Sequence, residues 1–171
     1  MATDLSELNA APTERFVAVC GPLFEHSPWI AERTAARRPF ASRDALHRAL
    51  CETMRAATEA EQLALVRAHP DLVGRAALAG TLTKESTAEQ RAAGLGGLST
   101  DEVRRFQEFN AAYQAKFGFP FVICARENKK DAILAAFPVR LAATPAQELS
   151  TALTEIEKIA RLRLYDAVTE G

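Results

Sequence analysis

Residues that begin and end helices recur along the whole sequence and constrain its fold more than any other feature. Ser99 and Glu102 have the spacing of a capping box, in which both side chains satisfy backbone N–H groups at a helix start. Ser86 and Glu89 repeat this spacing. Thr144-Pro145 places proline at a first helical position, where its missing N–H breaks no hydrogen bond. The sequence therefore predicts short helices joined by short connections.

Apolar residues follow helical spacing between these signals, which predicts a single all-α domain spanning residues 1–171. We expect about eight helices with short connections and no domain linker. The segments run over Asp4–Ala10, Glu14–Leu23, Trp29–Arg37, Arg43–Ala57, Glu59–Arg67, Asp71–Ala79, Ser86–Ala93, Ser99–Phe117, Asn128–Phe137 and Thr144–Val168. The face of the fourth segment that is expected to be buried carries Leu46, Leu50 and Met54.

One short stretch, residues 118–125, is predicted to be extended rather than helical. Pro120 favours extended backbone in the residue before it, and Phe121-Val122-Ile123 is an aromatic and β-branched run. The sequence offers no second strand to pair with this stretch. Its backbone donors and acceptors therefore need other partners.

Composition excludes several classes of protein. The net charge of −1, from 21 basic and 22 acidic residues, gives no basic footprint for nucleic acid. No run approaches the roughly 18 apolar residues of a membrane span. Three scattered cysteines fit a reducing compartment better than a disulfide framework. Neither a signal peptide nor a peroxisomal tripeptide is visible, so we expect a cytoplasmic protein.

The three histidines differ in their surroundings. His69 stands at a helix end, directly before Pro70, where a fixed imidazole is suited to proton transfer. Taken alone, this position favours a histidine that interacts with a helix C-terminus. His47 and Cys51 are four residues apart and could place two metal ligands on one helix face, but no further ligands lie nearby. His26 precedes a helix start and is expected to be a surface or capping residue.

Two other groups of polar residues have both a structural and a functional interpretation. Ser86 and Glu89 can cap a helix, yet a helix N-terminus also favours an anionic ligand, and Gln90 adds an amide. Arg161 and Arg163 lie on the last helix on different faces. Either arginine can be solvated or can turn inward to bind a carboxylate.

The order and spacing of several motifs resemble the family of 2-oxo-4-hydroxy-4-carboxy-5-ureidoimidazoline (OHCU) decarboxylases. The resemblance covers nearly the whole chain. It rests on Phe24-Glu25-His26-Ser27-Pro28-Trp29, Arg38-Pro39-Phe40, His69-Pro70-Asp71-Leu72, Ser86-x-x-Glu89-Gln90 with Ala93-Gly94-Leu95, Asn110-x-x-Tyr113-x-x-Lys116-Phe117-Gly118-Phe119-Pro120-Phe121, and Glu155-Ile156-x-Lys158-Ile159-Ala160-x-Leu162-Arg163-Leu164.

This resemblance implies an all-helical enzyme, commonly a homodimer, that converts OHCU to S-allantoin in urate degradation without cofactor or metal. It assigns proton transfer to His69. Our own mechanistic hypothesis adds Glu89, to orient His69 or the substrate hydroxyl, and Arg163, to attract the anionic substrate and steady the developing charge. Substrate contacts are implied for Pro70, Ser86, Glu89, Gln90, Phe121, Val122, Ile123, Cys124, Ala125 and Arg163. A non-catalytic helical interaction module, such as a dimeric regulator, is the alternative that the helix signals alone also allow.

Overall fold

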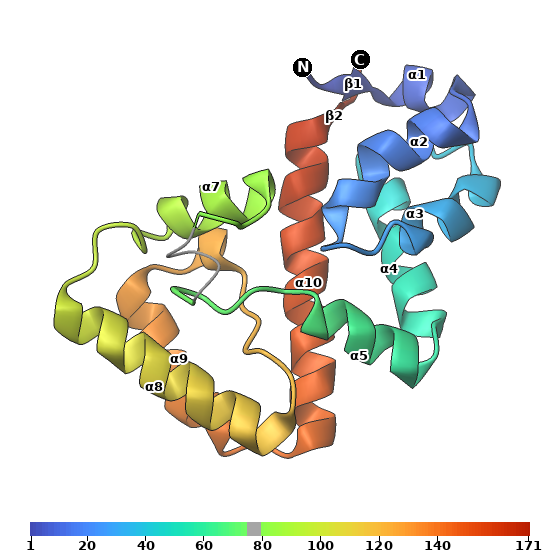
Figure 1. Ribbon diagram of the computed structural model, residues 1–171. Helices are drawn as coiled ribbons and strands as arrows, with labels where there is room; N and C mark the ends of the chain where they lie inside the picture. The colour runs from blue at the N-terminus through green and yellow to red at the C-terminus, as the bar shows by residue number, and fades with distance from the viewer. Residues whose placement is uncertain (75–79) are drawn as a thin grey trace. The chain divides into compact units, whose positions relative to one another are not determined.

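Helices account for nearly all regular structure in residues 1–74 and 80–171, which the computed structural model describes (Figure 1). The predicted all-α class is confirmed. The chain divides into two compact units: unit 1 comprises residues 1–68 and 157–171, and unit 2 comprises residues 69–156. That the whole chain forms one functional domain stays a prediction. None of the described helices is long and apolar enough to cross a membrane.

Unit 1 is built from short helices around an apolar core. The buried face predicted for α4 is confirmed, because Leu46, Leu50 and Met54 are fully buried. Helix α5 occupies the predicted range, and Thr58 and Glu61 form a capping box at its start. The elements are α1 (Leu5–Ala10), α2 (Thr13–Cys20), η1 (Gly21–Leu23), α3 (Trp29–Thr34), η2 (Ala35–Arg37), α4 (Arg43–Ala56) and α5 (Glu59–Arg67), with the last part of α10 (Pro145–Ala167).

A two-stranded parallel sheet joins the ends of the chain within unit 1. Strand β1 (Thr3–Asp4) pairs with β2 (Val168–Thr169), and Thr3 lies opposite Val168. Figure 1 shows both chain ends beside this pair. The pair was not predicted, because two-residue strands so far apart in the sequence have no recognisable local pattern.

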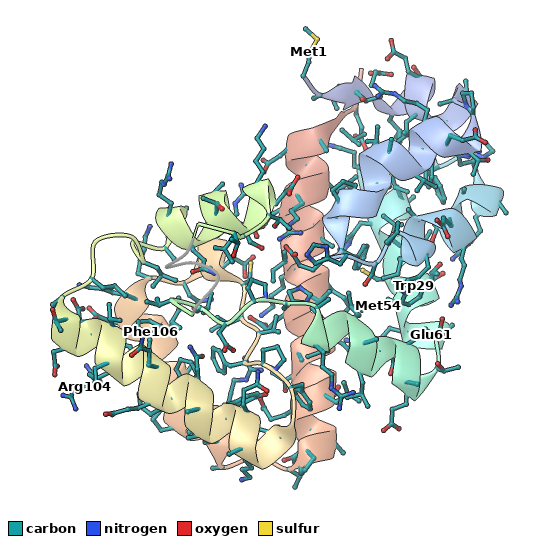
Figure 2. All side chains as sticks on the ribbon, in the orientation of Figure 1. Met1, Trp29, Met54, Glu61, Arg104 and Phe106 are labelled. Atoms are coloured by element: carbon teal, nitrogen blue, oxygen red, sulfur yellow. The ribbon has the colours of Figure 1, made fainter. Side chains whose placement is uncertain are left out.

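Unit 2 contains α7 (Lys84–Ala92), α8 (Thr100–Phe117), η3 (Ala125–Glu127), α9 (Lys130–Leu141) and the first part of α10. The predicted Ser99–Glu102 capping box begins α8, and Gly118 ends it with a left-handed φ of 74°. Arg104 and Phe106 point to opposite sides of α8 in Figure 2. Phe106 is fully buried and packs edge-on against Phe137 of α9, with ring centroids 6.2 Å apart.

Helix α9 corrects the prediction at both ends. Lys129, not Asn128, is its N-cap, and the Asn128 side chain instead donates to the carbonyl of Cys124 at 3.0 Å. The helix was predicted to end at Phe137, but it continues through Pro138 to Leu141. Burial of Ile133, Leu134, Phe137 and Arg140 along the helix stabilises it across the proline.

The helix predicted over Asp71–Ala79 falls largely outside the described residues. Its first part, residues 71–74, forms a turn in which the N–H of Gly74 donates to the carbonyl of Asp71 at 3.2 Å.

Candidate active site

Helix α7 begins three residues earlier than predicted. Thr83 is its N-cap, and the Thr83 hydroxyl accepts a hydrogen bond from the N–H of Ser86 at 3.1 Å. The predicted Ser86–Glu89 capping box is therefore wrong. The motif was misleading because Thr83 is itself a good N-cap and competes with Ser86 for that position. Ser86 thus lies inside the helix, where its side chain is not needed at the helix start.

The buried face of α7 is polar. Ser86, Glu89 and Gln90 are only 6%, 9% and 7% exposed. Their spacing of three and four residues places them on one side of the helix. A helix in a soluble protein normally buries apolar residues on its inner face. This polar face is the strongest local sign of a binding site in unit 2.

The His69 turn is tied to α7 and α8 by two hydrogen bonds. His69 follows α5 and is 9% exposed, and Pro70 comes next. The N–H of Val73 donates to the side-chain oxygen of Gln90 at 3.2 Å. Asn110 of α8 donates through Nδ2 to the carbonyl of Leu72 at 2.8 Å. These bonds fix the turn directly after His69 and Pro70.

Asp71 is the one carboxylate of this turn, residues 69–74. Its Oδ1 is buried and has no hydrogen-bond partner among the described residues. Loss of hydration on burial raises its pKa, and a hydrogen bond with Gln114 opposes that rise. The backbone also crowds here, because a Cβ on Gly74 would lie 2.6 Å from the Cβ of Asp71.

The extended segment lies within the predicted range but is shorter, because Gly118 is the left-handed C-cap of α8 and Ala125 begins η3. Buried side chains bind part of its main chain. The carbonyl of Val122 accepts from Arg140 at 2.5 Å, and the N–H of Cys124 donates to Glu155 at 3.1 Å. In the part of the chain that the structure describes, the N–H and C=O of Ile123 have no hydrogen-bond partner.

Helix α7 packs against the end of the extended segment. It contacts η3, and Lys129 donates to the carbonyl of Ala92 at 2.7 Å. Burial raises the pKa of the Cys124 thiol to about 11, and the negative charges of Glu127, Glu155 and Glu89 add to that rise. Unit 2 therefore brings together three of the predicted groups: the His69 turn, the polar face of α7 and the extended segment.

Arg163 lies on the part of α10 that belongs to unit 1. Its guanidinium donates to the carboxylate of Glu25 at 2.8 Å and to the carbonyl of Pro22 at 3.0 Å. Both charged side chains are almost fully buried, at 5% and 1% exposure. Glu25 was not predicted to have a role, although an acid between Phe24 and a helix-starting Ser-Pro step could have suggested one.

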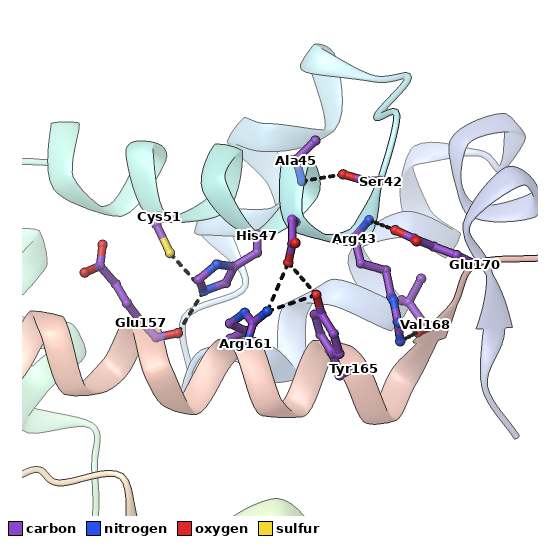
Figure 3. Close-up of polar contacts among 11 residues, drawn as sticks. Ser42, Arg43, Ala45, His47, Cys51, Glu157, Arg161, Tyr165, Val168 and Glu170 are labelled. Atoms are coloured by element: carbon purple, nitrogen blue, oxygen red, sulfur yellow. Dashed lines mark hydrogen bonds and ion pairs between the residues drawn. The ribbon is translucent and has the colours of Figure 1, made fainter. Parts of the chain in front are cut away.

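His47, Cys51 and Arg161 were the other candidate site residues, and they have structural roles in unit 1 (Figure 3). The Nε2 of His47 lies 2.8 Å from the carbonyl of Glu157 and 3.3 Å from the sulfur of Cys51. Burial raises the pKa of Cys51 to about 12, which disfavours the thiolate that a metal would need. No group of three or more metal-ligand side chains occurs among the described residues. Arg161 is half-exposed and pairs with Asp44.

Sequence reasoning missed four buried polar residues that support the site. Three of them were assigned to helices but not to buried faces, and Arg140 lay beyond the predicted end of its helix at Phe137. No local pattern in the sequence marks these residues as buried. They are Asn110, Arg140, Glu148 and Glu155.

Comparison with known proteins decides the family. A model of the OHCU decarboxylase family matches residues 9–165. A protein of Haloferax volcanii named 2-oxo-4-hydroxy-4-carboxy-5-ureidoimidazoline decarboxylase is 41% identical over 162 residues, which cover 95% of this chain and 94% of that protein. The chain belongs to the OHCU decarboxylase family. Members of the OHCU decarboxylase family are decarboxylating lyases, and the predicted enzyme class is confirmed.

Two solved structures are similar to this OHCU decarboxylase family member. A crystal structure of (S)-allantoin synthase matches with a TM-score of 0.75 at 27% identity, over 97% of this chain and 54% of that one. A crystal structure of OHCU decarboxylase in the presence of (S)-allantoin matches with a TM-score of 0.69 at 24% identity, over 91% and 97% of the two chains. The second likeness supports the fold alone.

Proposed function

We propose that this protein decarboxylates OHCU to S-allantoin without a cofactor, with His69 as the proton-transfer residue. Family membership supports the reaction. The observation that carries the local assignment is the polar buried face of α7, which a purely structural helix would not need. It adjoins the turn that carries His69 through the Val73–Gln90 hydrogen bond.

The chemistry fits a site made of hydrogen-bonding side chains. Loss of carbon dioxide leaves an electron pair, which the imine-containing ring of OHCU can accept, so the step requires no external electron sink. The protein must then stabilise the enol-like intermediate and deliver a proton to one face of C5. His69 would move that proton, and Glu89 would orient His69 or the substrate hydroxyl.

The remaining residues would bind the substrate. Ser86, Gln90 and the main chain at Pro70 and at residues 121–125 would hold the ring and the ureido arm. Arg163 would bind the anionic substrate and steady the developing charge. Because Glu25 neutralises Arg163 in the free protein, Arg163 would act through directed N–H groups more than through net charge.

The proposal extends to the state of the protein. We propose that residues 1–171 act as one OHCU decarboxylase-like domain, and that the protein is a cytoplasmic homodimer. These statements rest on the family resemblance and on three cysteines that form no disulfide. Sedimentation of the purified protein tests the dimer.

Circular dichroism of freshly generated OHCU tests the reaction. The protein should accelerate the appearance of the S-allantoin signal, whereas a non-catalytic interaction module would not. His69→Asn should abolish the acceleration and leave the far-ultraviolet spectrum and the unfolding midpoint unchanged. His47→Asn is a matched control, since His47 lies in unit 1 beside Glu157, and it should retain activity. Near-normal activity in His69→Asn would refute the role of His69.

A further inference from the structure

A buried ion pair in unit 2 contacts the extended segment through one of its two side chains. Arg140 of α9 donates through Nε to Glu148 of α10 at 2.7 Å, and the two side chains are 10% and 2% exposed. The hydroxyl of Tyr113 donates to the same Glu148 oxygen at 2.5 Å. Two donors therefore fix the position of the Glu148 carboxylate.

The same guanidinium holds the extended segment by its main chain and by a side chain. One Nη of Arg140 donates to the carbonyl of Val122 at 2.5 Å, and the guanidinium lies 4.3 Å from the ring centroid of Phe121. Phe121 in turn stacks on Phe137, with centroids 3.9 Å apart. Position and direction of the backbone at Val122 thus depend on Arg140.

Stability alone does not account for this arrangement. Burying two charges carries a desolvation cost that their attraction often only offsets, and apolar residues of similar volume are frequently as stable. In addition, Nη2 of Arg140 is buried and has no hydrogen-bond partner among the described residues, which lowers stability. The guanidinium is oriented so that it binds Val122 and Glu148, and this orientation leaves one of its N–H groups without an acceptor in the described part of the chain.

Ile123 lies between two fixed points of the main chain. Arg140 binds the carbonyl of Val122 on one side, and Glu155 accepts from the N–H of Cys124 on the other. Within the described residues, the N–H and C=O of Ile123 itself are not hydrogen-bonded. Ile123 is only 9% exposed, and unpaired backbone groups in buried residues are rare and indicate a ligand or water.

We propose that Arg140 and Glu148 are positioning residues for substrate binding. They hold Val122 so that the backbone groups of Ile123 meet the amide-like ring and ureido arm of the substrate, and they do not touch the substrate themselves. This inference rests on the proposed function. It assigns the pair to binding and not to proton transfer.

Steady-state kinetics of Arg140→Ala and Glu148→Gln test the inference. We expect KM to rise about tenfold, which corresponds to about 1.4 kcal/mol of lost binding, with kcat nearly unchanged. Tyr113→Phe should raise KM less, since it removes one donor to Glu148 and keeps the ion pair. Guanidinium added to Arg140→Ala should restore a low KM, because it can occupy the vacated space and bind the carbonyl of Val122.

Ile133→Ala is the matched control for lost stability. Ile133 is fully buried on the same helix as Arg140, and no polar contact links it to the extended segment. It should lower the unfolding midpoint without raising KM. The isosteric Glu148→Gln and Tyr113→Phe provide the result even if Arg140→Ala does not fold.

The outcomes separate the two proposals. If the wild-type protein is active and KM is unchanged in Glu148→Gln and Tyr113→Phe, the positioning role alone is overturned. A KM rise in Ile133→Ala equal to that in Glu148→Gln would also overturn it, because general loosening would then explain the effect. A wild-type protein that does not accelerate S-allantoin formation would overturn the proposed function and this inference together.

Discussion

The side-chain oxygen of Gln90 accepts a hydrogen bond from the backbone N–H of Val73 at 3.2 Å. Val73 has a φ of 55°, in the left-handed region that β-branched residues rarely adopt. Both residues are buried. Gln90 therefore does two things: it contributes to the polar face of α7, and it stabilises an unfavourable backbone conformation four residues after His69.

Gln90→Ala should lower the free energy of unfolding by about 1–3 kcal/mol, because the N–H of Val73 would stay buried without an acceptor. Gln90→Met keeps a side chain of similar length without an acceptor and should lose nearly as much stability. Urea unfolding of both variants measures the losses. Full stability in Gln90→Met would show that the hydrogen bond is not the cause.

Thr83→Ala should destabilise the protein by about 1 kcal/mol, because Thr83 is the N-cap of α7. Ser86→Ala removes no cap and should instead reduce activity, since Ser86 is proposed to contact the substrate. Thermal unfolding and OHCU turnover, measured on both variants, give the comparison. A larger stability loss in Ser86→Ala than in Thr83→Ala would restore the capping role of Ser86.

Asp71→Asn should stabilise the protein at neutral pH. The folded state raises the pKa of Asp71, so the folded protein binds this proton more tightly than the unfolded chain does. The ionised carboxylate therefore destabilises the folded state above its folded pKa, and this penalty disappears as the pH falls below the ordinary value of 3.8.

The measurement for Asp71 is the difference in unfolding free energy between Asp71→Asn and wild type as a function of pH. The gain should be greatest near neutrality and should vanish in acid. Asp131→Asn, an exposed aspartate on α9, controls for the general effect of removing a negative charge. A gain independent of pH would argue against desolvation as its origin.

Glu25→Ala should cost about 3–5 kcal/mol, because it leaves the charge of Arg163 buried without its carboxylate. The double variant Glu25→Leu/Arg163→Met should recover most of that stability but should not bind the substrate. Chemical unfolding of wild type, Glu25→Leu, Arg163→Met and the double variant provides a double-mutant cycle. Additive effects of the two substitutions would mean that the ion pair contributes no coupling energy.

Local signals predicted those elements whose ends are determined by their own residues. The start of α8 was correct because Ser99 and Glu102 form both hydrogen bonds of the predicted capping box. The start of α7 was wrong because two candidate caps, Thr83 and Ser86, are three residues apart, and the helix begins at the first of them. Helix α9 continues past Pro138, where local rules predict a stop, because its buried residues pack on both sides of the proline.

The candidate site was predictable only in part, for a related reason. The family motifs indicated His69, Glu89 and Gln90, and the extended segment followed from its β-branched residues. Arg140, Glu148 and Glu155 act on that segment through contacts between distant parts of the chain, such as Glu155 with Cys124. No local pattern distinguishes a buried glutamate on a helix from a solvated one until its partner is known.

The polar inner face of α7 also limits how firmly this helix is held. A helix that buries serine, glutamate and glutamine gains little from removing apolar surface from water, so its local opening requires less free energy than global unfolding. A molecule bound against Ser86 and Glu89 would favour the closed helix by mass action. Occupancy of the site and order of α7 are therefore thermodynamically linked, and substrate should slow amide hydrogen exchange in this helix more than elsewhere.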